Sequence, residues 1–143
     1  MTQDNLNIVV ADWTKDKEKL SKIRRIVFID EQNVPEELEW DDDDADSIHF
    51  LVSIEQHVVA TARLKKDGQI GRMAVLKEYR NQGIGSTLLA FVLQTAAQNR
   101  HKKVYLHAQT SAIHFYEKQG FKAYGEIFYE ANIPHRGMLL NIC

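Results

Sequence analysis

The chain has 143 residues, which is enough for one domain built around one hydrophobic core. Hydrophobic residues make up 44% of it and charged residues 27%, as in ordinary soluble globular proteins. The formal net charge of −2 and the pI of about 6.3 argue against a nucleic-acid-binding domain, which usually presents a basic face. We expect a single domain over residues 1–143.

Cysteine usage and the N-terminal sequence narrow the class further. Cys143 is the only cysteine, so the sequence excludes a disulfide framework and a cysteine-ligated zinc cluster, and we expect no metal. No apolar run is long enough to cross a membrane. The first ten residues, MTQDNLNIVV, lack the basic and then apolar order of a signal peptide. We therefore expect a cytoplasmic protein with no membrane partner.

The first half of the chain predicts a helix among four strands. Short apolar runs predict the strands, and apolar residues at helical spacing predict a helix over residues 16–29. Residues 30–39 are expected to form a loop or a broken helix, because Pro35 interrupts the pattern. The segment WDDDDAD at 40–46 is expected to be a solvated acidic connection. The predicted strands span residues 6–11, 49–54, 58–66 and 70–76.

The second half predicts two helices and three strands. Residues 84–99 carry apolar side chains along one stripe, which predicts an amphipathic helix. A shorter helix over 111–120 is expected to begin at Ser111 as its N-cap and to end at Gly120. The order of these elements predicts an α/β (α+β) fold in which a mixed sheet carries helices on its faces. The remaining strands span residues 103–108, 121–130 and 136–142.

Two glycines, Gly83 and Gly85, stand where the chain passes from a strand into helix 84–99, where glycine does not stabilise a helix. The first turn of a helix leaves backbone N–H groups without intrahelical partners, and together with the helix dipole they attract anions. Glycine lets a large anion approach the backbone and allows positive φ. Residues 82–86, with Arg80 beside them, therefore predict a cradle for a phosphate or diphosphate. The alternative is a tight turn that uses glycine only for packing.

Two common phosphate-binding motifs do not fit this segment. A P-loop requires a lysine after its second glycine, whereas Gly85 is followed by Ser86. A dinucleotide-binding fingerprint requires a third glycine where Leu88 stands, and an acidic residue about 20 residues further on. No acidic residue occurs between Glu78 and Glu117.

A third motif does fit. Residues 80–85, RNQGIG, follow the strand RMAV and precede a helix, and they resemble the [R/Q]xxGx[G/A] acyl-CoA motif of the GNAT acetyltransferase superfamily. Downstream, HFYEKQGF at 114–121 resembles the Tyr-bearing helix that ends in Gly-Phe in the same superfamily. The resemblance covers residues 8–142. Within it, EQNVP at 31–35 and IPH at 133–135 are similar to segments of a poorly characterised bacterial branch.

The resemblance implies a GNAT-like mixed, mostly antiparallel central sheet of about six or seven strands, flanked by about four helices. It also implies acetyl-CoA as the acyl-donor cosubstrate. The resemblance implies three groups of CoA-binding residues. The diphosphate would be bound by Arg80, Gln82, Gly83, Ile84, Gly85 and Ser86, and the pantetheine arm by backbone groups of Met73, Ala74 and Val75 on a splayed strand. The CoA would also be lined by Gln109, Ser111 and Tyr116.

The resemblance implies catalytic roles as well. Tyr116 matches the general acid that protonates the departing thiolate, and the alternative is a tyrosine that only packs its helix on the sheet. The central strand offers no acid as a general base, so the candidates are His107 and Glu31, followed by His135 and Glu126. For each histidine the alternative is a structural role in a strand or a turn, and for Glu31 it is an ordinary surface acid.

Together these features predict an enzyme, an N-acetyltransferase that moves an acetyl group from acetyl-CoA to an amine by direct attack in a ternary complex. The acceptor would be a small-molecule or peptide amine, and the resemblance also allows a homodimer. The acidic residues at 41–46 suggest a cationic acceptor, with a solvated loop as the alternative. Two other functions are left open: a non-catalytic acyl-CoA-binding or sensing module on the same fold, and a nucleotide-phosphate protein unrelated to CoA.

Overall fold

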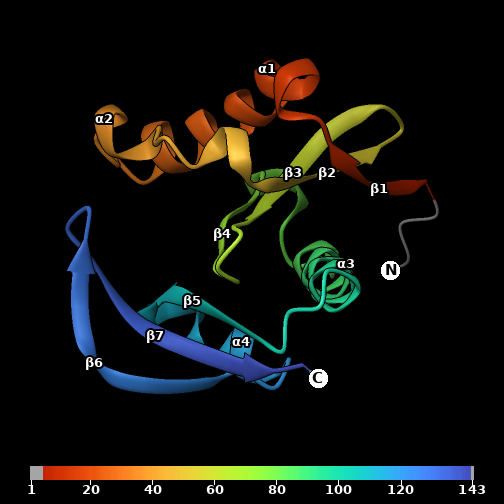
Figure 1. Cartoon of the computed structure of the whole chain (residues 1–143). Helices are drawn as coiled ribbons and strands as arrows, with labels where there is room; N and C mark the ends of the chain where they lie inside the picture. The colour runs from red at the N-terminus through yellow and green to blue at the C-terminus, as the bar shows by residue number, and fades with distance from the viewer. Residues whose placement is uncertain (1–4, 143) are drawn as a thin grey trace.

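The computed structural model describes residues 5–142, which form two antiparallel sheets (Figure 1). The first sheet has the order β1-β2-β3-β4 and the second the order β5-β7-β6. The strands are β1 (Leu6–Ala11), β2 (Ile48–Ile54), β3 (His57–Leu64), β4 (Ile70–Val75), β5 (Lys103–Gln109), β6 (Lys122–Glu130) and β7 (Ile133–Asn141). The predicted fold class and the mostly antiparallel pairing are confirmed. The strands, however, divide into two sheets instead of forming one.

The division lies between β4 and β5. Among the described residues, the two sheets are bridged only by the parallel pair of Gln69 and Tyr105. Further along β4, its register against β3 shifts between Thr61 and Arg63, and Arg72 on the facing segment has a φ of 49°. A bulged residue with left-handed backbone bends a strand and increases its twist. The bulge in β4 therefore lies in the part of the strand that has separated from β5.

In the described part of the chain, four α-helices accompany the sheets: α1 (Trp13–Arg24), α2 (Glu36–Glu39), α3 (Ile84–Gln98) and α4 (Ile113–Glu117). The helix predicted over 16–29 begins earlier because Asp12 is its N-cap, and the Asp12 carboxylate accepts from the N–H groups of Thr14 and Lys15 at 2.9 and 3.4 Å. At its other end α1 passes directly into a π-helical segment, Arg25–Glu31. Helical structure thus extends further than the sequence pattern indicated.

The helix predicted over 111–120 is shorter than expected. Residues Thr110–Ala112 form a 3₁₀ turn, so Ser111 lies inside that turn and is not the N-cap of α4. The prediction that Gly120 ends this helical segment is confirmed. Gly120 has a left-handed backbone with a φ of 98°, and it donates its N–H to the carbonyl of Glu117 at 3.0 Å.

The two sheets share one hydrophobic core, to which α3 contributes its apolar stripe. Side chains from both sheets, including Phe50 of β2, Val104 of β5 and Met138 of β7, are fully buried in it. Most of the predicted apolar stripe of α3 is buried, and Leu93 is the member that is only partly covered. The buried members are Ile84, Leu88, Leu89, Val92 and Ala96. The common core holds the two sheets together although their strands part.

No helix within residues 5–142 is long and apolar enough to cross a membrane. Cys143 and the first four residues of the N-terminal segment lie outside the described residues.

Candidate active site

A cleft of about 1230 Å³ is bounded by β4 and β5, where the sheets part. Its other walls are the start of α3, α4 and the turn between β6 and β7. Most of the predicted site residues line it: Met73, Ala74, Val75, Arg80, Gly83, Ile84, Gly85, Ser86, His107, Gln109, Ser111 and Tyr116. Gln82 and Glu31 are predicted site residues that are not among those lining the cleft. Glu31 nevertheless contacts Arg80 of the wall.

The N-terminus of α3 forms one part of the wall. Gly83 is its N-cap with a φ of 83°, and a Cβ built on Gly83 would meet no atom within 4 Å. Thr87 donates its N–H to the Gly83 carbonyl at 3.1 Å, so the amides of residues 84–86 precede the first hydrogen bond of the helix. Gly83 has no side chain with which to cap them. The left-handed backbone explains the glycine, and the open space in front of it leaves room for an anion.

Arg80 lines the same cleft, and two other segments hold its side chain. Its Nε donates to the Val75 carbonyl at 2.9 Å, and its Nη1 and Nη2 each donate to the Glu31 carboxylate at 2.7 Å. The hydrogen bonds from Arg80 hold the pKa of Glu31 below its ordinary value. The hypothesis that Glu31 is a general base does not fit this geometry, because its carboxylate is already engaged and is a weak base.

The edge of β4 that faces the cleft is open. Between residues 5 and 142, no strand pairs with this edge after the bridge at Gln69. Met73 and Val75 lie on it, and the Tyr116 hydroxyl of α4 donates to Met73 Sδ at 3.8 Å. Burial raises the pKa of Tyr116 to about 12, so the phenol stays protonated at neutral pH. A protonated hydroxyl therefore lies beside an unpaired strand edge.

Gln109, the last residue of β5, links the two sides of the cleft. Its Nε2 donates to Gln32 Oε1 at 2.8 Å, and Gln32 follows the π-helical segment after α1. Both glutamines line the cleft, and Ser111 lies close by on the 3₁₀ turn. Gln32 lies within the EQNVP segment, which is thereby placed at the site.

Two histidines of the second sheet also line the cleft. His107 Nδ1 lies 2.9 Å from Glu130 Oε1, and His135 Nδ1 lies 2.7 Å from the Ile133 carbonyl oxygen. The Phe128 ring contacts both imidazoles, with centroid distances of 5.1 Å to His107 and 6.0 Å to His135. The cleft thus brings together a tyrosine and two histidines from segments that are separate in the sequence.

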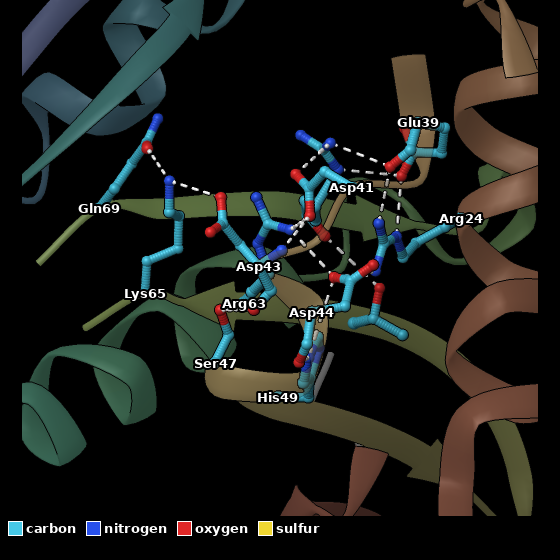
Figure 2. A network of polar contacts seen from close by, with 12 residues as sticks. Arg24, Glu39, Asp41, Asp43, Asp44, Ser47, His49, Arg63, Lys65 and Gln69 are labelled. Carbon is cyan, nitrogen blue, oxygen red and sulfur yellow. Dashed lines mark hydrogen bonds and ion pairs between the residues drawn. The ribbon is translucent and has the colours of Figure 1, made fainter. Parts of the chain in front are cut away.

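The acidic segment that was predicted to be solvated is partly internal (Figure 2). Asp44 is 4% exposed, and Arg24 and Arg63 contact its carboxylate at 2.8 and 2.9 Å. Arg24 also contacts Glu39 at 2.8 Å, and its guanidinium lies 5.2 Å from the ring centroid of Trp40. The prediction of a solvated connection is wrong for Asp44, because arginines from α1 and β3 neutralise it inside the protein.

The same network extends to the cleft. Arg72 of β4 places its Nε 3.1 Å from Glu39 Oε2 and its Nη2 3.2 Å from Asp41 Oδ2, and all three residues line the cleft. Burial raises the pKa of the Glu39 carboxyl above its ordinary value, against the opposing effect of Arg72 and Arg24. Because guanidinium groups already occupy these carboxylates, they do not favour the attraction of a cationic acceptor.

Sequence reasoning missed several residues of the cleft: Gln32, Glu39, Arg72 and Glu130. None of them belongs to the glycine motif or to the tyrosine-bearing helix. A turn signal after Glu130 marks the end of a strand, but only the sheet geometry decides which surface that turn faces. Glu126, which was considered as a base, is exposed on β6 and is not among the lining residues.

Comparison with known proteins agrees with this architecture. Residues 13–142 match the family model described as an acetyltransferase (GNAT) domain. The uncharacterised N-acetyltransferase YjcF of Bacillus subtilis is 36% identical over 132 residues, which cover 87% of this chain and 94% of YjcF. The crystal structure of Escherichia coli ElaA is similar with a TM-score of 0.83 and 32% identity, covering 94% of this chain and 97% of ElaA.

A crystal structure of an acyl-CoA N-acyltransferase from Pseudomonas aeruginosa is also similar, with a TM-score of 0.83 and 31% identity, and covers 94% of this chain and 98% of its own. The family match includes every segment that lines the cleft. The chain therefore belongs to the GNAT acetyltransferase family.

Proposed function

We propose that this protein transfers the acetyl group of acetyl-CoA to a primary amine of a small molecule or peptide, by direct attack within a ternary complex. The observation that carries the proposal is the cleft between the parted strands β4 and β5. Along it lie the uncapped N-terminus of α3, the open edge of β4, and the side chains of Tyr116 and His107. Family membership supports acetyl transfer as the reaction class.

The start of α3 would hold the diphosphate of CoA. The amides of residues 82–86 and the helix dipole attract an anion, and the open space at Gly83 allows it to approach the backbone. Arg80 adds a fixed positive charge at the same place. In this proposal the carboxylate of Glu31 is engaged by Arg80 and does not act on the amine.

The open edge of β4 would hold the pantetheine arm. Backbone groups of Met73, Ala74 and Val75 would pair with its amides in the manner of an added strand. Gln109 and Ser111 line the cleft from the β5 side and would contact the same arm. The thioester would then lie between the two sheets, near Tyr116.

His107 would take the proton of the amine, and Tyr116 would assist the departing sulfur. The substrate amine arrives as an ammonium ion and must lose a proton before attack, for which His107 is the candidate base. A phenol with a pKa of about 12 is a much weaker acid than a thiol, whose pKa is roughly 8.5. Tyr116 is therefore suited to donate a hydrogen bond to the departing sulfur rather than to complete a proton transfer.

The main alternative is a binding or sensing module that holds acyl-CoA without turnover. It would need the α3 terminus and the β4 edge, but it would gain nothing from a tyrosine and a histidine in the same cleft. Because both side chains line the cleft, the transferase is the better-supported function. If the protein instead binds a nucleotide phosphate unrelated to CoA, ATP should raise its thermal stability more than acetyl-CoA does.

The test is release of free thiol from acetyl-CoA with a panel of amines, including polyamines, an aminoglycoside and peptides with free N-termini. We expect thiol release with at least one amine, and a strong loss of it in Tyr116→Phe. Tyr129→Phe is the matched control, because Tyr129 is 71% exposed and is not among the lining residues. Tight acetyl-CoA binding with no turnover on any amine would favour the binding module, and preferential stabilisation by ATP would overturn both.

A further inference from the structure

His107 and Glu130 form a side-chain pair at a wall of the cleft, where their side chains are 35% and 49% exposed. They come from β5 and from the end of β6, and His107 Nδ1 lies 2.9 Å from Glu130 Oε1. An ionised carboxylate can only accept a hydrogen bond, so the proton of the neutral imidazole lies on Nδ1. The lone pair is then on Nε2, for which the part of the chain from 5 to 142 offers no hydrogen-bond partner. The pair therefore leaves a basic nitrogen at a wall of the cleft.

The backbone fixes the position of Glu130. It is the last residue of β6 and pairs with Ile133, the first residue of β7. The two residues between them, Ala131 and Asn132, have φ values of 51° and 64°, as in the two-residue turns that match the twist of a hairpin. Figure 1 shows this turn at the free end of the long β6–β7 hairpin. The tight turn thus places the Glu130 carboxylate near His107 of β5, although β7 lies between β5 and β6 in the sheet.

The imidazole of His107 is also restrained by packing. Phe128 of β6 meets it edge-on, at 5.1 Å between centroids and an interplanar angle of 83°. His135, the other histidine of the cleft, differs because its Nδ1 contacts the neutral carbonyl of Ile133. A carboxylate stabilises a protonated imidazole more strongly than a carbonyl does, because it carries a full negative charge. Of the two histidines, His107 is therefore the one whose Nδ1 faces a carboxylate.

We propose that Glu130 is the positioning residue for His107: it fixes the Nδ1–H tautomer and stabilises the imidazolium that forms when Nε2 takes a proton from the acceptor ammonium. This inference rests on the proposed acetyl transfer and adds to it a residue outside the recognised motifs. The free amine nitrogen then forms a bond to the thioester carbonyl carbon, and the carbon–sulfur bond breaks. The sulfur keeps the bonding electron pair and takes the second proton of the amine nitrogen, and His107 returns its proton to solvent.

A spectroscopic measurement on the free protein tests the pair without turnover. In protein with ¹⁵N-labelled histidine, the ring nitrogens of His107 are assigned as the signals that disappear in His107→Gln. We expect shifts typical of the Nδ1–H tautomer in the wild type, and a change towards Nε2–H in Glu130→Ala. The matched control is Glu117→Gln, which removes the carboxylate of an exposed pair with His114 outside the cleft. An unchanged His107 tautomer in Glu130→Ala overturns the proposal.

Kinetics test the catalytic consequence, with acetyl-CoA and the amine that turns over fastest in the panel. We expect kcat to fall roughly tenfold to a hundredfold in Glu130→Gln and further in His107→Gln, with the KM for acetyl-CoA unchanged. Glu117→Gln should retain most of the wild-type kcat. An unaltered kcat in Glu130→Gln overturns the positioning role but leaves acetyl transfer standing. Wild-type protein that acetylates no amine overturns both.

Discussion

The guanidinium of Arg80 and the carboxylate of Glu31 meet through two hydrogen bonds of 2.7 Å, and Arg80 lines the same cleft as the residues that begin α3. The pair joins the EQNVP segment after α1 to the glycine-rich turn. It also places a carboxylate beside a site proposed to bind an anion. Because the carboxylate neutralises part of the charge of Arg80, it opposes the attraction of a diphosphate.

We therefore expect Glu31→Gln to bind acetyl-CoA more tightly. An exposed ion pair is worth roughly 0.2–1 kcal/mol, so the dissociation constant should fall by about fivefold at most. Isothermal titration calorimetry at low and high salt checks this, since screening should reduce the gain. Weaker binding by Glu31→Gln would mean that Glu31 positions Arg80 instead of competing with the ligand.

Gly83→Asp should abolish acetyl-CoA binding with little loss of fold. The substitution adds a negative charge where the diphosphate is proposed to lie, and no atom lies within 4 Å of the new Cβ. Its φ of 83° will strain any side chain by about 1 kcal/mol. Gly125→Asp is the matched control, because Gly125 has a φ of 71°, equally open surroundings and no place in the cleft. Binding of acetyl-CoA by Gly83→Asp at wild-type affinity would contradict the proposed cradle.

Tyr116→Phe should lower kcat by roughly tenfold to a hundredfold and leave the affinity for acetyl-CoA nearly unchanged. Its hydroxyl contacts only Met73 Sδ within residues 5–142, so its removal costs little in stability. Because the pKa of Tyr116 is about 12, no loss of rate from its ionisation is expected on the alkaline side up to pH 10 or so. Stopped-flow detection of thiol release measures both effects. A variant as active as the wild type would remove Tyr116 from the mechanism.

Asp44→Asn should destabilise the protein by about 3 kcal/mol, because it removes the buried carboxylate that Arg24 and Arg63 share and leaves Arg24 only Glu39 and Arg63 only Asp41 as ion-pair partners. Urea denaturation of the purified variant measures this loss. Asp46→Asn is the control, since the Asp46 side chain is 73% exposed and a change there should stay within about 0.5 kcal/mol. Equal effects of the two substitutions would show that the buried network does not stabilise the fold.

Stability should also fall as the pH drops below the ordinary pKa of histidine. Burial lowers the pKa of His49, whose ring stacks on Trp13 at 4.6 Å and whose Nε2 donates to the Asp44 carbonyl at 2.7 Å. The unfolded chain therefore binds this proton more readily, so the contribution of neutral His49 is complete above pH 6.5 and decreases below it.

From this group alone, the free energy of unfolding should fall by up to about 1.4 kcal/mol per pH unit in the range below pH 6.5. His49→Gln should remove that part of the dependence, as measured by urea denaturation at several pH values. His57→Gln, at an exposed position, should keep the wild-type slope. Identical slopes in the wild type and in His49→Gln would contradict the assignment.

Local patterns in the sequence were sufficient for the parts of the site that depend on neighbouring residues. The turn at Gly83 needs a left-handed backbone just before an amphipathic helix, and both features are visible in a few consecutive residues. The strands and the helix over 84–99 followed from periodicity for the same reason. The resemblance to the family motif also predicted Tyr116 as a site residue, because the glycine at the end of its helix is visible in the sequence.

The tertiary structure alone decided which distant side chains meet. The sequence shows Asp44 within an acidic run, but its burial follows from arginines on α1 and β3 that fold over it. Glu130 lies far from His107 in the chain, and only the pairing of β6 with β7, and of β7 with β5, brings the two together. The alternation of side chains along a strand shows which face of the sheet a residue lies on. It does not show which residue lies beside it on the next strand, because register and strand order depend on the whole packed core.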